Sequence, residues 1–171
     1  MMQSRAALNP RSMPRRLCKM CPGREIYYNQ GIMGFISRIT SDLTVRKDVT
    51  VVISLLLTTV CGYFATKKQN KIHVFSLFII TLTLIDTLSW QHHFIWLIFP
   101  FIATAVTLHR KKMAVPGILL CISYLLTAWN FKHPEIYAHF PAVLFLSNQF
   151  YGAILLWGII IYLLEINPQN T

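Results

Sequence analysis

The chain has 171 residues, of which 54% are hydrophobic and 13% are charged, and its 16 Lys and Arg outnumber 6 Asp and Glu. A soluble globular domain carries about a quarter charged residues, so this composition excludes a protein surrounded only by water. It also excludes a disordered chain and, with four cysteines, a disulfide scaffold.

Residues 1–25 are predicted to form a basic, disordered arm. The segment is rich in Arg, contains three prolines and lacks the apolar stretch of a secretory signal. An artefactual gene start and, by composition alone, an Arg-rich transit segment are the alternatives. Cys18 and Cys21 have metal-ligand spacing, but one such pair supplies half of a tetrahedral zinc site, so no metal is predicted.

Residues 26–48 are predicted to form an amphipathic helix that lies in the membrane interface. Apolar side chains recur there at steps of three and four residues, which is the spacing of one helical face. The apolar positions are Ile32, Phe35, Ile36, Ile39 and Leu43, and the polar positions opposite them are Ser37, Arg38, Ser41 and Asp42.

Five apolar blocks follow and predict a transmembrane helical bundle over residues 49–166. About 20 residues of helix cross a bilayer core, and backbone groups in lipid must bond within the segment. The fold class is therefore all-α and multi-pass. The predicted spans are residues 49–66, 72–90, 92–108, 113–129 and 141–164.

The short connections between the spans predict the orientation of the bundle. Residues 67–71 and 109–112 are rich in Lys and Arg, which remain on the cytoplasmic side. Residues 89–93 and 130–140 then face outward, and the C-terminus ends inside. The N-terminus is left outside although residues 1–48 hold 9 of the 16 basic residues, a conflict that a natural chain beginning further upstream would resolve. The expected location is the plasma membrane.

Asp86 and a pair of histidines mark the outer end of the second span. An ionisable group within a span is a functional candidate by default. If the helix continued, Asp86, Trp90 and His93 would share one face, and the carboxylate could hold the imidazole and raise its pKa. The alternative is an interfacial belt, where Trp is favoured and His is tolerated.

Two motifs resemble a known family. Residues 89–93 read Ser-Trp-Gln-His-His and lead into an apolar span with a proline, and residues 29–38 read Asn-Gln-Gly-Ile-Met-Gly-Phe-Ile-Ser-Arg. Together they resemble the C-terminal half of the polyprenyl-phosphate-sugar-dependent membrane glycosyltransferases of glycosyltransferase family 87, which includes bacterial phosphatidylinositol-mannoside mannosyltransferases. The resemblance covers residues 26–164. Family members are about twice as long and usually have Ser-Pro at the positions of Asp86 and Thr87.

The resemblance implies a GT-C-like fold and an inverting hexosyl or mannosyl transfer in the cell envelope. The donor would be a polyprenyl-phosphate sugar and the acceptor a lipid or glycan hydroxyl on the outer face, with no cofactor and no nucleic acid involved. His92 or His93 would donate to the leaving phosphate and Arg38 would pair with it. The other implied substrate-binding residues are Asn29, Gln30, Ser89 and Trp90.

The sequence does not identify the residue that would act as the catalytic base. In the family it lies on a first outer loop that would precede this chain, so a separate N-terminal half is an expected partner. The outer carboxylates outside the N-terminal region that could take the acceptor proton are Asp86 and Glu135.

Three alternatives remain open on the sequence. The chain could be a non-catalytic membrane subunit or a degenerate remnant of such an enzyme. His73 and His109, at the inner ends of adjacent spans, could instead bind a haem between them. Residues 133, 135 and 139, which are His, Glu and His, could bind a metal together with the outer histidine pair.

Overall fold

The computed structural model describes residues 29–67, 70–87, 91–130, 140 and 142–166, and most of these lie in helices. The described ranges contain no strand, which confirms the all-α class. The predicted arm, residues 1–25, lies outside them. The helices are α2 (Ile32–Ile39), α3 (Leu43–Thr66), α4 (Lys71–Ile85), the 3-10 helix η3 (Gln91–Leu97), α5 (Ile98–Arg110), α6 (Ala114–Ala128), the 3-10 helix η5 (Ala142–Ser147) and α7 (Asn148–Glu165).

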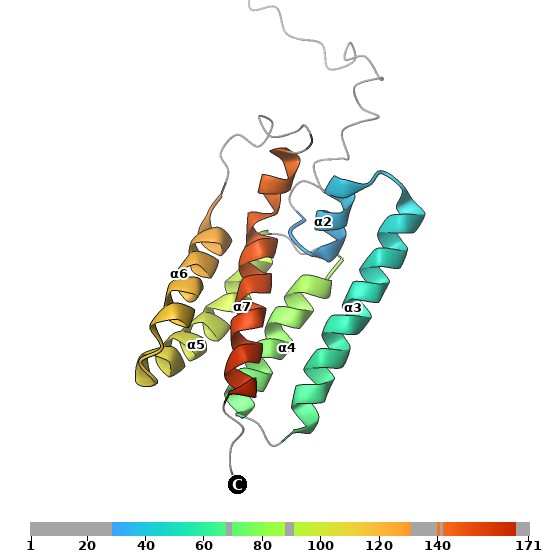
Figure 1. Ribbon diagram of the computed structural model, residues 1–171. Helices are drawn as coiled ribbons and strands as arrows, with labels where there is room; N and C mark the ends of the chain where they lie inside the picture. The colour runs from blue at the N-terminus through green and yellow to red at the C-terminus, as the bar shows by residue number, and fades with distance from the viewer. Residues whose placement is uncertain (1–28, 68–69, 88–90, 131–139, 141, 167–171) are drawn as a thin grey trace, which may run out of the picture.

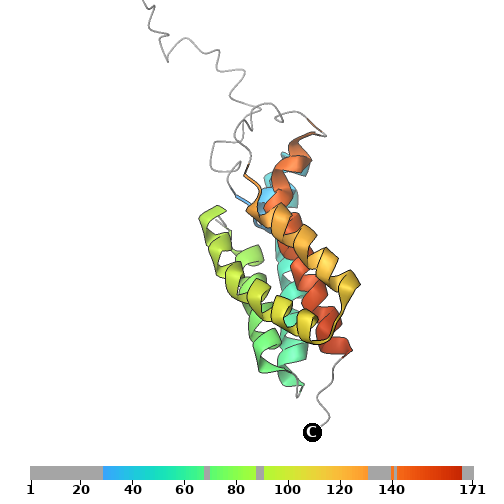
Figure 2. The same cartoon turned by 90° about the vertical axis from the view of Figure 1, so that its left-hand side faces the viewer.

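The five long helices alternate in direction and form a bundle (Figures 1 and 2). α7 packs between α4 and α6, α3 packs against α4, and α5 packs against α4 and α6. We call one end of the bundle the α2 end; it holds α2, the start of α3, the end of α4, η3 and the start of α7. The opposite end, where α3, α5 and α7 finish and α4 and α6 begin, is the basic end.

The predicted helix over residues 26–48 is wrong, because two helices share that segment. Thr40 has extended backbone and ends α2, and the Asp42 carboxylate then caps α3. Its Oδ1 accepts hydrogen bonds from the backbone N–H groups of Thr44, at 2.8 Å, and Val45, at 3.3 Å. A capping carboxylate satisfies donors that have no partner within the helix, so residues 43–48 belong to the next helix.

The boundaries of the predicted spans also change at the α2 end. α4 ends at Ile85 rather than residue 90, and the third span starts as the 3-10 helix η3 before it continues as α5. Pro100 is the third residue of α5, just after the change from the 3-10 helix to the α-helix. α6 differs from its predicted span by one residue at each end, whereas the last span begins as η5 and continues as α7.

Three helical stretches of the described part are long and apolar enough to cross a membrane. They are Leu43–Thr66, His92–Arg110 and Ala142–Glu165. α4 and α6 are apolar but have 15 residues each, which makes them about 22 Å long. The structure therefore supports a membrane protein, and the count of five spans stays a prediction.

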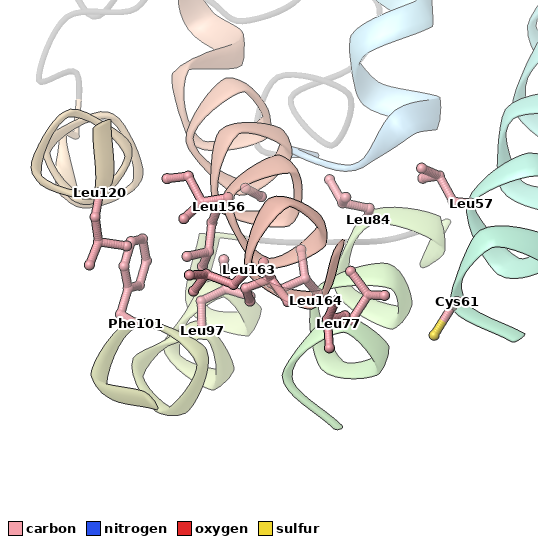
Figure 3. Packing of buried hydrophobic residues seen from close by; sticks show 14 of the residues in the cluster. Leu57, Cys61, Leu77, Leu84, Leu97, Phe101, Leu120, Leu156, Leu163 and Leu164 are labelled. Carbon is pink, nitrogen blue, oxygen red and sulfur yellow. The ribbon is translucent and has the colours of Figure 1, made fainter. Parts of the chain in front are cut away.

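The core lies around α7. Its buried side chains, including Leu156, Leu163 and Leu164, contact residues of α4 and η3 such as Leu77 and Leu97 (Figure 3). Many large apolar side chains on α3, α5 and α6 are nevertheless exposed. Exposed apolar surface of this extent is what lipid covers in a membrane protein.

α6 and α7 lie close together at Gly152. A Cβ atom there would lie 2.2 Å from Thr127 Oγ1 and 2.7 Å from the Ser123 carbonyl oxygen. The Ser123 hydroxyl donates to the Gly152 carbonyl oxygen at 2.7 Å. Small residues and hydroxyl groups hold helices together in lipid because they let two backbones come close. Gly158, on the same helix, has nothing within 4 Å of its Cβ position.

Candidate functional site

The segment that carries the Asn-Gln motif folds back onto the start of α2. The Asn29 side chain accepts a hydrogen bond from the Gly31 N–H at 3.0 Å and donates one to the Thr87 carbonyl oxygen at the end of α4. Arg38, one helix length later, donates to the Asn29 carbonyl oxygen at 2.9 Å. The motif is therefore held together by hydrogen bonds between its own residues. The Asn29 side chain attaches it to the segment that follows α4.

Gly34 explains why a glycine stands inside this motif. A Cβ atom on Gly34 would lie 2.1 Å from the Asn29 carbonyl oxygen and 2.7 Å from its carbon. Only a residue without a Cβ lets the preceding segment lie so close to the helix. The spacing of Asn29, Gly34 and Arg38 thus has a structural cause, since all three meet at one carbonyl group.

Gln30 and Arg38 connect the same unit to the end of η5, directly before α7 begins. The Gln30 amide donates to the Leu146 carbonyl oxygen at 2.8 Å, and an Arg38 guanidinium nitrogen donates to Ser147 Oγ at 3.1 Å. Gln30 is buried, and its Oε1 atom accepts no hydrogen bond from the described residues. An unsatisfied amide oxygen in a buried position is costly unless a further donor reaches it.

The side chains of Asp86 and His93 contact each other at the same end of the bundle. His93 Nδ1 lies 3.3 Å from Asp86 Oδ2, and the two side chains are 35% and 45% exposed. The rings of His92 and His93 contact each other edge to face, with centroids 4.4 Å apart. Partial exposure leaves this group accessible to a substrate. Ser89 and Trp90 lie outside the described residues, as do residues 133, 135 and 139.

The predicted pairing of Asp86 with His93 is present, but the predicted continuous helix is not. Asp86 is the C-cap of α4, and His93 lies on η3 after a reversal of the chain. The contact therefore joins two elements and not two turns of one helix. Because Asn29 donates to the carbonyl of Thr87, next to Asp86, the structure brings the two motifs together across 58 residues of sequence.

A small apolar groove begins directly after the histidine pair. Its volume is about 190 Å³, and it lies between η3 and α5 on one side and α6 on the other. Its lining residues are Phe94, Ile95, Ile98, Phe101, Tyr124, Thr127 and Ala128. Apolar walls beside a polar rim fit an amphipathic ligand better than a free sugar.

Sequence reasoning missed a polar cluster at the start of α7. Ser147, Asn148 and Gln149 are all buried. The Asn148 amide donates to the carbonyl oxygens of Leu126 and Trp129, at 2.7 and 2.6 Å, in the last turn of α6. Gln149 Oε1 accepts no hydrogen bond from the described residues. The sequence signal was three consecutive polar residues inside an apolar block. Burying polar groups in lipid costs free energy unless the groups are hydrogen-bonded or take part in function.

The two histidines considered for haem binding have different surroundings. His73 is buried, and neither ring nitrogen makes a hydrogen bond with the described residues. His109 is exposed at the end of α5. Two axial ligands have to face one cofactor, so this difference in burial does not favour a shared haem. Among residues 29–67, 70–87, 91–130, 140 and 142–166, no group of three or more His, Cys, Asp or Glu could hold a metal ion.

No protein family, curated protein or solved structure matches this chain.

Proposed function

We propose that this chain is the C-terminal part of a plasma-membrane glycosyltransferase. It would transfer a hexose, such as mannose, from a polyprenyl phosphate to a lipid or glycan hydroxyl on the outer face, within a GT-C-like fold. The observation that carries the proposal is the half-exposed Asp86–His93 pair with His92 beside it. This pair lies at the α2 end of the bundle, where the other motif, Asn29 to Arg38, is also located.

The charge distribution supports the orientation that this proposal requires. Basic residues in short loops remain in the cytoplasm. The basic end carries five exposed cations among the described residues, and Glu165 is the carboxylate near them. These cations are Lys67, Lys71, Arg110, Lys111 and Lys112. The α2 end, with the histidine pair, then faces outward.

The proposed transfer proceeds by attack of the acceptor hydroxyl oxygen on the anomeric carbon. The bond from that carbon to the phosphate oxygen breaks, and the phosphate leaves with the electron pair. Nδ1 of His93 faces the Asp86 carboxylate, which favours the tautomer with its hydrogen on Nδ1. In this proposal His93 therefore takes the hydroxyl proton at Nε2. His92 donates a hydrogen bond to the leaving phosphate, where negative charge grows. The first isoprene units lie in the groove that begins at Phe94.

The remaining residues of the implied site support the catalytic group and do not contact the sugar in this proposal. Asn29, Gln30 and Arg38 make hydrogen bonds to other elements of the fold. They position the end of α4, and therefore Asp86, against the start of α7. In this proposal they are positioning residues. Arg38 is half-buried, and its guanidinium group donates to Ser147 Oγ and to the Asn29 carbonyl oxygen.

The first experiment measures transfer from a radiolabelled polyprenyl-phosphate mannose by the purified chain in proteoliposomes. His93→Gln should lower turnover by about 10² to 10⁴-fold, the usual contribution of a general base. His109→Gln, an exposed histidine at the basic end, is the matched control and should leave turnover unchanged. Equal turnover in the two variants would refute the role given to His93.

The second experiment tests the orientation independently of activity. In a chain without native cysteines, His92→Cys should react with a membrane-impermeant maleimide added to the outside of intact cells. Lys111→Cys should react only after permeabilisation, since it lies at the basic end. Labelling of position 92 from the cytoplasmic side alone would overturn the proposal.

A second candidate function is a non-catalytic membrane subunit. The observation that favours it is that Asn29, Gln30 and Arg38 all bond to other parts of the fold. A remnant that keeps these bonds would keep its fold without transferring sugar. Absence of labelled product, with folding and orientation intact, would select this candidate.

A further inference from the structure

A second groove opens at the basic end, far from the histidine pair. It lies between the end of α3 and the start of α4 and has a volume of about 520 Å³. Its walls are mainly apolar, and two lysines stand at its mouth. The lining residues are Cys61, Ala65, Thr66, Lys67, Lys71, Val74, Phe75 and Phe78.

The apolar wall of this groove follows one face of each helix. Lys71, Val74, Phe75 and Phe78 recur at the three- and four-residue spacing of α4. From position 71 to position 78 the helix rises about 10 Å. The rings of Phe75 and Phe78 are about half exposed. The groove is thus an apolar slot that runs from the basic end toward the middle of the bundle.

The charged mouth is held in place by local contacts. The Lys67 Nζ atom lies 4.1 Å from the centroid of the Tyr63 ring, a cation–π contact. Hydrogen bonding to Tyr63 raises the pKa of Lys67 above its ordinary value. Lys71 is the first residue of α4, directly after the capping residue Asn70. Both lysines are exposed, one as the C-cap of α3 and the other at the start of α4.

We propose that this groove binds an anionic phospholipid of the membrane leaflet at the basic end. The phosphate contacts Lys67 and Lys71, and one acyl chain lies along Val74, Phe75 and Phe78. Charge complementarity selects the headgroup, because clustered basic residues beside a membrane-spanning helix attract anionic lipid. The apolar wall selects a lipid over a free anion, since inorganic phosphate gains nothing from Phe75 and Phe78. The inference needs only that the basic end lies at a membrane surface, and it is independent of sugar transfer.

Lipid selectivity of the full chain tests this proposal. The chain is reconstituted in phosphatidylcholine vesicles that contain spin-labelled phosphatidylglycerol or spin-labelled phosphatidylcholine, and the association of each probe is measured. We expect preference for phosphatidylglycerol in the unchanged chain. In the double variant Lys67→Gln/Lys71→Gln, the ratio of phosphatidylglycerol to phosphatidylcholine association should fall by about fivefold for each lysine removed. High salt should also lower this ratio. Inorganic phosphate at matched ionic strength should not displace the lipid.

A matched control separates this groove from a diffuse basic surface. Arg110→Gln/Lys111→Gln removes the same charge from the same end of the bundle but lies outside the groove, so it should change the preference less than twofold. Ala65→Trp keeps every charge and fills the groove, and it should release the lipid.

Equal losses in the two double variants would overturn the proposal and indicate non-specific attraction. Unchanged binding in Ala65→Trp, or equal association of the two probes with the unchanged chain, would also overturn it. Circular dichroism of each variant confirms that the helices remain. If sugar transfer fails while phosphatidylglycerol binding persists, the proposed function fails and this inference stands.

Discussion

Replacing Gly34 with alanine tests whether the Asn29 segment lies against α2. The new Cβ would be 2.1 Å from the Asn29 carbonyl oxygen, far inside van der Waals contact, so Asn29 has to move. The movement weakens the hydrogen bonds that Asn29 makes with Arg38 and Thr87. It therefore releases α2 from the end of α4.

The expected cost follows from three contributions. Overpacking of a tight contact costs about 1 to 3 kcal/mol. The weakened hydrogen bonds add about 1 kcal/mol each, and more for a charged donor such as Arg38. Alanine regains about 1 kcal/mol of helix propensity relative to glycine. We expect Gly34→Ala to lower the free energy of unfolding by about 3 kcal/mol.

The assay is thermal unfolding in detergent micelles, followed by circular dichroism. A loss of 1 kcal/mol shifts the Tm of a chain of this size by about 2 to 4 °C, so Gly34→Ala should unfold about 6 to 12 °C lower. Gly62→Ala is the control, because nothing lies within 4 Å of its Cβ position in α3. It should be neutral or stabilising by up to about 1 kcal/mol.

A double-mutant cycle with Arg38→Met sharpens this test. If Gly34→Ala already breaks the bond from Arg38 to Asn29, the two substitutions together cost less than the sum of their separate effects. A Gly34→Ala chain that is as stable as Gly62→Ala would refute the close approach of Asn29 to α2. Strict additivity with Arg38→Met would refute the shared carbonyl group.

Two further predictions concern the packing of α7. Gly152→Ala should destabilise the protein by about 2 kcal/mol, because the new Cβ would meet Thr127. Gly158→Ala on the same helix is the control and should not destabilise it, since nothing lies within 4 Å of that Cβ position. Equal Tm values for the two variants would contradict the close α6–α7 contact. Asn148→Asp should cost about 2 kcal/mol or more, because a carboxylate cannot donate to the two α6 carbonyl oxygens that the amide now reaches. Unfolding in micelles measures both, and Asn148→Asp at low pH, where a protonated carboxyl can donate again, should recover part of the loss.

The sequence by itself determined the helical class and the approximate position of each long helix. Residues 113–129 show this most directly, because the apolar block and the helix Ala114–Ala128 nearly coincide. Apolar length between charged turns predicts a helix wherever water is absent, since the backbone must then bond within its own segment. The charged turns between these apolar blocks also indicated that the two ends of the bundle differ in charge.

Local chemistry decided the boundaries that the apolar pattern missed. Asp42 counted as one polar position on an amphipathic face, but its carboxylate starts a new helix by accepting two backbone hydrogen bonds. Hydrophobic periodicity does not register a cap, because a cap depends on where one side chain meets free N–H groups. The early end of α4 at Ile85 was missed for a similar reason, since periodicity did not indicate that Asp86 ends one helix and that His93 belongs to another.

Only the tertiary structure decided which polar residues meet. Asn29 reaches Thr87, and Gln30 reaches Leu146, across 58 and 116 residues of chain. The substrate-binding role of Asn29, Gln30 and Arg38 stays a prediction. What the fold shows is that their side chains bond to Thr87, Leu146 and Ser147. A buried polar side chain bonds to whichever group packing brings within reach, and that partner is set by the arrangement of helices in space, which no spacing along the chain contains.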